Sequence, residues 1–100
     1  TRAEKTISLT DSNMAEAAGS YIDLETSKSG FGKIIIGDAQ EYATFVFKAD
    51  GTVILIQNSD NVVTTSTDGK LVIRDAGTNA RIVNELGSTL IATIIINYNA

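Results

Sequence analysis

Side chains that branch at Cβ constrain the fold of this chain more than any other feature. Isoleucine, valine and threonine make up 31 of the 100 residues. Such side chains lose rotamer freedom in a helix and pack well on a pleated sheet. Apolar and polar positions also alternate, as in the segment EYATFVFK, where Ala43, Phe45 and Phe47 share one face. We therefore expect an all-β protein.

Glycine, aspartate and asparagine punctuate the chain at short intervals. Asp50-Gly51 and Asp68-Gly69 predict tight hairpins, because a type I′ turn requires positive φ at both central residues. Short strands separated in this way are typical of a single antiparallel β-sandwich or jelly-roll domain, here spanning residues 1–100. The expected strands are 5–10, 20–26, 32–36, 41–49, 52–58, 62–67, 70–75, 79–85 and 89–98.

The segment DSNMAEAAG departs from the strand pattern. Asn13 followed by Glu16 resembles a capping pair, and Gly19 suits the end of a helix. A helix of one or two turns is marginal on its own. We expect one short helix or turn near the N-terminus.

Three expected strands carry apolar side chains on both faces. In the segment TVILIQN, Ile54 and Ile56 lie on one face and the other apolar residues lie on the other face. In TLIATIIINY, Ile91 and Ile95 lie on the second face in the same way, and the segment KIIIG is a third case. Burying one isoleucine is worth about 1.5–3 kcal/mol, so several left in water would favour aggregation. Either the chain itself covers these second faces, in a tightly wrapped barrel or under its N-terminal segment, or they meet another subunit. We favour the second explanation, with these four isoleucines as candidate interface residues of a homo-oligomer.

Composition argues against several classes of partner. The net charge is −4 and the Lys and Arg residues are scattered, which disfavours a nucleic-acid or anionic-lipid partner. The longest apolar run, 90–96, is far shorter than the roughly 20 residues of a membrane helix. We expect neither nucleic-acid binding nor membrane insertion.

The usual catalytic residues are missing. Without His or Cys there is no Ser-His-Asp or Cys-His arrangement and no ordinary zinc site. The acidic residues fall mainly at expected turns or on exposed faces, where they solvate the surface. We expect no enzyme activity, no cofactor and no metal.

The candidates for a ligand site are Tyr42 and the polar loop that contains Asn58, Asp60 and Asn61. Sugar sites set an aromatic ring against the pyranose face, with amide and carboxylate groups bonding the hydroxyls. Tyr21 and Phe31 are further rings of this kind. Loops of Asn, Asp and Ser also occur simply because they close turns, and a tyrosine ring often packs while its hydroxyl stays wet.

The segment DGKLVIRDAGTNARIVNELGSTLIATIIINYN resembles the C-terminal end of small β-sandwich domains in bacteriophage tail fibres and tailspikes. The elements that carry the resemblance are the Asp68-Gly69 turn, Leu71 and Ile73, Asp75 and Gly77, Ile82, Asn84, Leu86-Gly87-Ser88, and a final strand ending in Tyr98. The resemblance implies the C-terminal part of a longer fibre or spike chain, exposed on the virion tail. It further implies a homotrimer that in some cases binds host cell-surface polysaccharide.

Two other functions stay open. A monomeric carbohydrate-binding module of a secreted bacterial enzyme would share the fold class. A purely structural knob of a tail needle or capsid fibre would be a trimer without a ligand. Oligomeric state distinguishes the first alternative from a trimeric tail-fibre domain that binds glycan, and a glycan screen distinguishes the second.

Overall fold

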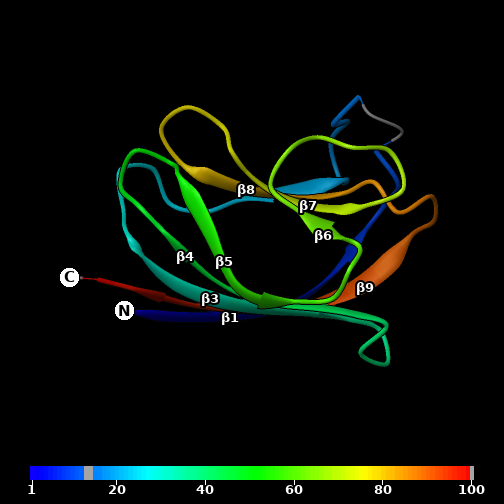
Figure 1. Ribbon diagram of the computed structural model, residues 1–100, viewed down its shortest axis with the longest axis horizontal. Helices are drawn as coiled ribbons and strands as arrows, with labels where there is room; N and C mark the ends of the chain where they lie inside the picture. The colour runs from blue at the N-terminus through cyan, green and yellow to red at the C-terminus, as the bar shows by residue number, and fades with distance from the viewer. Residues whose placement is uncertain (13–14, 100) are drawn as a thin grey trace.

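The computed structural model describes residues 1–12 and 15–99, which form two packed β-sheets (Figure 1). The sheets contain strands of two to nine residues joined by turns and loops. The strands of the described residues are β1 (Arg2–Leu9), β2 (Tyr21–Asp23), β3 (Gly30–Ile36), β4 (Glu41–Phe47), β5 (Val53–Asn58), β6 (Val62–Val63), β7 (Leu71–Asp75), β8 (Ala80–Asn84) and β9 (Leu90–Tyr98).

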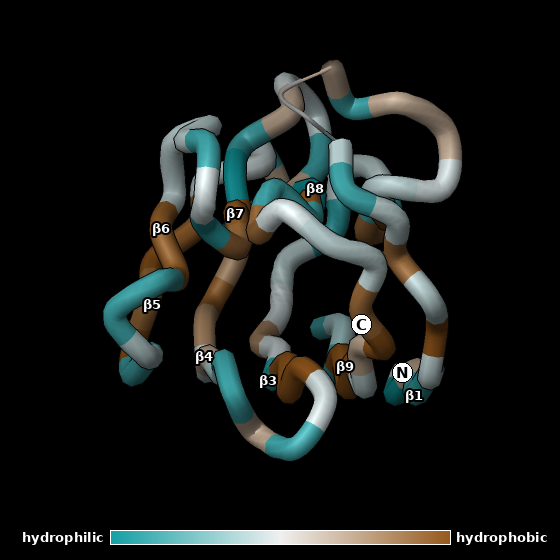
Figure 2. Tube along the Cα trace, turned by 90° about the vertical axis from the view of Figure 1, so that its right-hand side faces the viewer, coloured by the Kyte–Doolittle hydropathy of each residue, from teal (hydrophilic) through white to brown (hydrophobic). Residues whose placement is uncertain are grey.

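One sheet has five strands in the order β1-β9-β3-β4-β5, and the other has four in the order β2-β8-β7-β6. Figure 2 shows the five-stranded sheet along the bottom, from β5 to β1, with β6, β7 and β8 above it. Neighbouring strands are antiparallel except for β6 and β7, which are parallel. The prediction of an all-β sandwich is confirmed.

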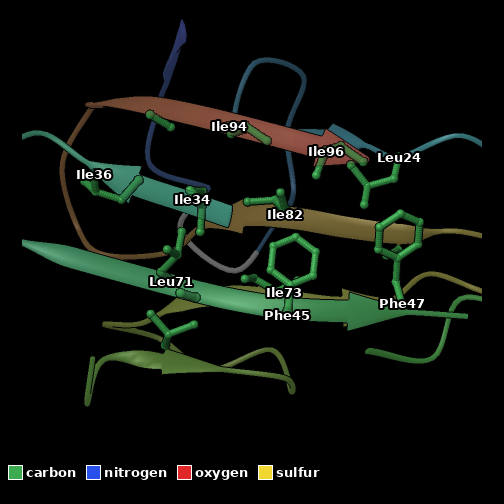
Figure 3. Packing of buried hydrophobic residues seen from close by; sticks show 14 of the residues in the cluster. Leu24, Ile34, Ile36, Phe45, Phe47, Leu71, Ile73, Ile82, Ile94 and Ile96 are labelled. Carbon is green, nitrogen blue, oxygen red and sulfur yellow. The ribbon is translucent and has the colours of Figure 1, made fainter. Parts of the chain in front are cut away.

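The hydrophobic core lies between the two sheets. Alternation along each strand sends every second side chain inward. Phe45, Ile34 and Ile94 from the larger sheet meet Ile73 and Ile82 from the smaller one, and all five are nearly or fully buried (Figure 3). The period-two pattern that predicts strands from the sequence is thus also the pattern that builds the core.

The two Asp-Gly turns differ from the prediction. Asp50-Gly51 does join an antiparallel pair, β4 and β5, but only Gly51 has positive φ, and its N–H donates to the carbonyl of Lys48 at 3.0 Å. This is a three-residue loop with glycine in the left-handed region, not a two-residue type I′ turn. Asp68-Gly69 forms no hairpin, because it lies in the loop between the parallel strands β6 and β7. The hairpin prediction there was wrong.

The described residues of the segment DSNMAEAAG, 11–12 and 15–19, contain a turn and no helix. Residues 18–19 lie in a turn, and Glu16 has a φ of 49°, which is outside the right-handed helical region. Asn13, the other member of the expected capping pair, lies outside the described residues. No helix in the described part of the chain is long and apolar enough to cross a membrane.

Candidate functional site

The outer face of the five-stranded sheet consists of the side chains of β1, β9, β3, β4 and β5 that point away from the smaller sheet. Among the described residues, every large apolar side chain that stays exposed lies on this outer face. These side chains, with their exposed fractions, are Phe31 (52%), Ile35 (36%), Tyr42 (42%), Ile54 (45%), Ile56 (62%) and Ile91 (52%). An ordinary sandwich would carry polar side chains at such positions.

Strand register brings several of these side chains together. Ile35 lies opposite Tyr42, and Phe31 lies opposite Val46, which in turn lies opposite Ile54. Residues directly opposite each other in an antiparallel pair have Cβ atoms about 4.5–5.5 Å apart. One apolar row therefore crosses β3, β4 and β5, and a second crosses β3 and β4.

A β-bulge in the edge strand β5 adds to this surface. Leu55 lies opposite Phe45 and Gln57 lies opposite Thr44, so Ile56 is an extra residue between them. A bulge redirects the side chain at which it occurs. Ile56 is accordingly the most exposed of the large apolar residues.

The four candidate interface residues all belong to the outer face. Ile54, Ile56 and Ile91 are each at least 45% exposed, so the explanation in which the chain itself covers these side chains does not hold for them. Ile95 lies on the same face, half-buried, opposite Lys33. Their role in an interface stays a prediction. Sequence reasoning gave the segment KIIIG, which contains Ile35, two apolar faces but chose no interface residue from it. It considered Phe31 and Tyr42 only as rings of a ligand site, although the alternation in GFGKIII places Phe31 and Ile35 on one face.

Two shallow depressions lie on the outer face, one on each side of Lys33 and Thr44, which line both. One has a volume of about 250 Å³ and is also lined by Phe31, Ile95 and Asn97. The other has a volume of about 280 Å³ and is also lined by Ile35, Tyr42 and Gln57. Each depression therefore has an aromatic wall, an amide and the shared ammonium group of Lys33.

The polar loop that sequence analysis nominated for ligand binding does not join either depression. Asn58 Nδ2 donates to the carbonyls of Ser59 at 2.8 Å and Val62 at 3.2 Å. Asn61 donates to Glu41 Oε2 at 2.9 Å and accepts from Lys70 Nζ at 3.0 Å. These amide groups hold the β5–β6 connection in place.

The remaining ligand candidates, Asp60 and Tyr42, lie in different parts of the surface. Asp60 is exposed in the loop, whereas Tyr42 lies on the outer face and lines the larger depression. None of Asn58, Asp60 and Asn61 lines a depression with Tyr42. The four candidates therefore do not form one pocket.

The opposite side of the sandwich carries an ion-pair network that sequence reasoning missed. Arg74 and Arg81 lie opposite each other on β7 and β8. Glu16 accepts from both, with distances of 2.6 Å to Arg74 Nη2 and 2.8 Å to Arg81 Nη1, and Asp23 accepts from Arg81 Nε at 2.6 Å. The two arginines flank one turn in the sequence, but nothing local places Glu16 beside them.

Two apolar side chains on the outer side of the smaller sheet are fully covered. Val72 and Val83 point outward from β7 and β8, because Ile73 and Ile82 beside them point into the core, yet neither has exposed surface. The contrast with the five-stranded sheet is clear. Of the large apolar side chains in the described residues, those that stay exposed all belong to the larger sheet.

The ion-pair network predicts loss of stability in acid. The hydrogen bond from Arg74 is the main cause that lowers the pKa of Glu16 below its ordinary value of 4.5, and the hydrogen bond from Arg81 lowers the pKa of Asp23 below 3.8. A carboxylate whose pKa is lowered by folding contributes stability above its unfolded pKa and loses it as pH falls through the folded pKa. We expect the free energy of unfolding to fall as pH drops below about 4.5.

Urea unfolding over an acid pH series checks this expectation. Glu16→Gln should be less stable than the parent at neutral pH and should lose less stability in acid. The exposed Glu25→Gln is the matched control and should follow the parent curve. Identical acid profiles for the parent and Glu16→Gln would contradict a stabilising role for the network.

Comparison with known proteins provides no relative from which a function could be transferred. No family model, curated protein or solved structure matches this chain. The resemblance to phage tail-fibre domains therefore stays a prediction from the residues of the C-terminal segment named above.

Proposed function

We propose that this chain is an assembly domain of a bacteriophage tail fibre or tailspike, exposed on the virion tail, in which three copies join through the outer face. The observation that carries this proposal is the concentration of exposed large apolar side chains on that one face. The copy number of three and the phage setting come from the resemblance of the C-terminal segment.

The energetics favour coverage of this face by another protein surface. Burying an apolar side chain contributes about 25 cal/mol per Å² of area removed from water, and six large side chains retain a third to two thirds of their surface. Interfaces between permanent partners are more apolar than ordinary surface and resemble a divided core. The outer face has that character.

One observation favours a second candidate, saccharide binding by a single chain. Phe31 and Tyr42 each form the wall of a shallow depression that also holds an amide, from Asn97 or Gln57, and the Thr44 hydroxyl. These are the groups that a sugar site uses. A monomer that binds glycan on this face and a trimer that buries it are mutually exclusive, so oligomeric state decides between them.

The test is the mass of the purified chain in solution, measured by light scattering at micromolar concentration. We expect three times the chain mass for the parent and a single-chain mass for Ile54→Asp and Ile91→Asp. Both isoleucines are exposed in the single chain, so the substitutions should leave its fold intact, whereas a charge in a dry interface is strongly unfavourable.

Thr64→Asp introduces the same charge at an exposed residue outside the five-stranded sheet and should remain trimeric. A single-chain mass for the parent would refute the assembly function. If that monomer bound host polysaccharide and Tyr42→Ala abolished the binding, the second candidate would take its place.

A further inference from the structure

Lys33 lies at the centre of the outer face. It is the middle residue of β3, which is the middle strand of the five-stranded sheet, and its side chain is exposed. In register it lies between Ile95 of β9 and Thr44 of β4, and it lines both depressions. A second copy that covers the apolar side chains of this face must therefore cover Lys33 as well.

Lys33 has no anionic partner among residues 1–12 and 15–99. The ion pairs within the described residues join Arg2 to Glu4, Arg74 to Glu16, and Arg81 to Glu16 and Asp23. An ammonium group that loses its water without gaining a partner is strongly unfavourable. The covering surface must therefore bring an acceptor to Lys33.

Glu4 is the acidic side chain on the outer face that can act as this acceptor. Among the described residues of the five strands, no other acidic side chain alternates onto the outer face. Glu4 lies opposite Ile95, which lies opposite Lys33. Two strand spacings of about 4.8 Å separate Glu4 from Lys33. No ion pair joins them within the described residues, where Glu4 pairs with Arg2 instead.

The existing partner of Glu4 holds it only weakly. Glu4 Oε2 lies 3.4 Å from Arg2 Nη2, and the side chains are 59% and 60% exposed. Exposed ion pairs of this kind contribute little to stability, so the carboxylate is available to a better partner. Within the part of the chain that the structure describes, the outer face thus offers the cation Lys33, without an ion-pair partner, at its centre and the loosely held anion Glu4 near its edge.

We propose that Lys33 of one copy pairs with Glu4 of the next copy when the outer faces come together. This inference rests on the proposed assembly function and specifies how the copies are aligned. In a closed ring of three, each copy uses different parts of its surface toward its two neighbours, so it gives Lys33 to one and Glu4 to the other. Two faces stacked symmetrically over Lys33 would instead bring two ammonium groups together, which disfavours that arrangement.

Charge exchange tests the pairing. Lys33→Glu and Glu4→Lys should each weaken association by on the order of 100-fold or more, because each places like charges together in the interface. The double variant restores opposite charges and should associate within about tenfold of the parent. Sedimentation over a concentration series measures the association constants, and circular dichroism confirms that each chain is folded.

Lys28→Glu and Glu25→Lys provide the matched controls, since both residues are exposed outside the five-stranded sheet. They should associate as the parent does. If the parent assembles and either the single variants are unaffected or the double variant is not restored, the pairing is overturned while the assembly function stands. A parent that stays a single chain at every concentration overturns both.

Discussion

Asn84→Ala is expected to lower the free energy of unfolding by about 3 kcal/mol or more, because it leaves several polar backbone groups without partners. Asn84 is 1% exposed at the end of β8. Its Nδ2 donates to the carbonyls of Leu9 at 2.9 Å and Ser88 at 2.8 Å, and its Oδ1 accepts from the N–H of Leu86 at 3.0 Å. One amide thus links the end of β1 in the larger sheet to the β8–β9 connection.

Urea unfolding measures this effect, and Asn84→Asp separates its parts. Aspartate can still accept from Leu86 but cannot donate to the two carbonyls, so we expect it to be strongly destabilising as well. Asn79→Ala is the control. One partner of Asn79 is the exposed Asp23 side chain, which water can still reach, so this variant should lose less stability than Asn84→Ala. A loss of less than about 1 kcal/mol for Asn84→Ala would show that water replaces the amide.

Gly30→Ala is the second substitution with a large expected effect, again about 3 kcal/mol or more. Gly30 is buried at the start of β3, opposite Tyr98 of β9. An added Cβ would collide with the carbonyl oxygen of Asn97 and lie 3.0 Å from Cα of Tyr98. Both obstacles are backbone atoms and cannot rotate away, so β3 and β9 would have to separate.

The urea midpoint of Gly30→Ala, compared with that of Ser29→Ala at the preceding residue, checks this expectation. Ser29→Ala removes only one long hydrogen bond, 3.3 Å from Asn99 Nδ2 to Ser29 Oγ, and should stay close to the parent. Equal midpoints for the two variants would mean that the strands accommodate a methyl group at position 30.

The alternation of apolar residues was sufficient to predict most of the strands. The expected strand 41–49 became β4 at Glu41–Phe47, and 89–98 became β9 at Leu90–Tyr98. The expected strand 62–67 shrank to Val62–Val63, followed by a loop rather than a hairpin. An Asp-Gly pair specifies a tight turn, but the direction of the next strand depends on packing with distant residues, here the pairing of β7 with β8.

The alternation of apolar residues also made part of the candidate surface predictable. Isoleucines on the second face of a strand are visible in the sequence, and Ile54, Ile56 and Ile91 are exposed as expected. The proximity of Phe31 and Tyr42 to them depends on which strands are neighbours, which local patterns do not reveal. The contact of Glu16 with Arg74, across 58 positions, has the same origin.

The bulge at Ile56 also bears on whether a foreign strand can add to the edge of the larger sheet. β5 is an edge strand, and its sequence VILIQN contains neither a charged residue nor a proline that would discourage a foreign strand from adding to it. The extra residue interrupts the regular spacing of backbone donors and acceptors that such a strand would need. Strand-by-strand extension toward fibrils is therefore hindered at this edge, while the flat side of the sheet stays free for a contact of limited size.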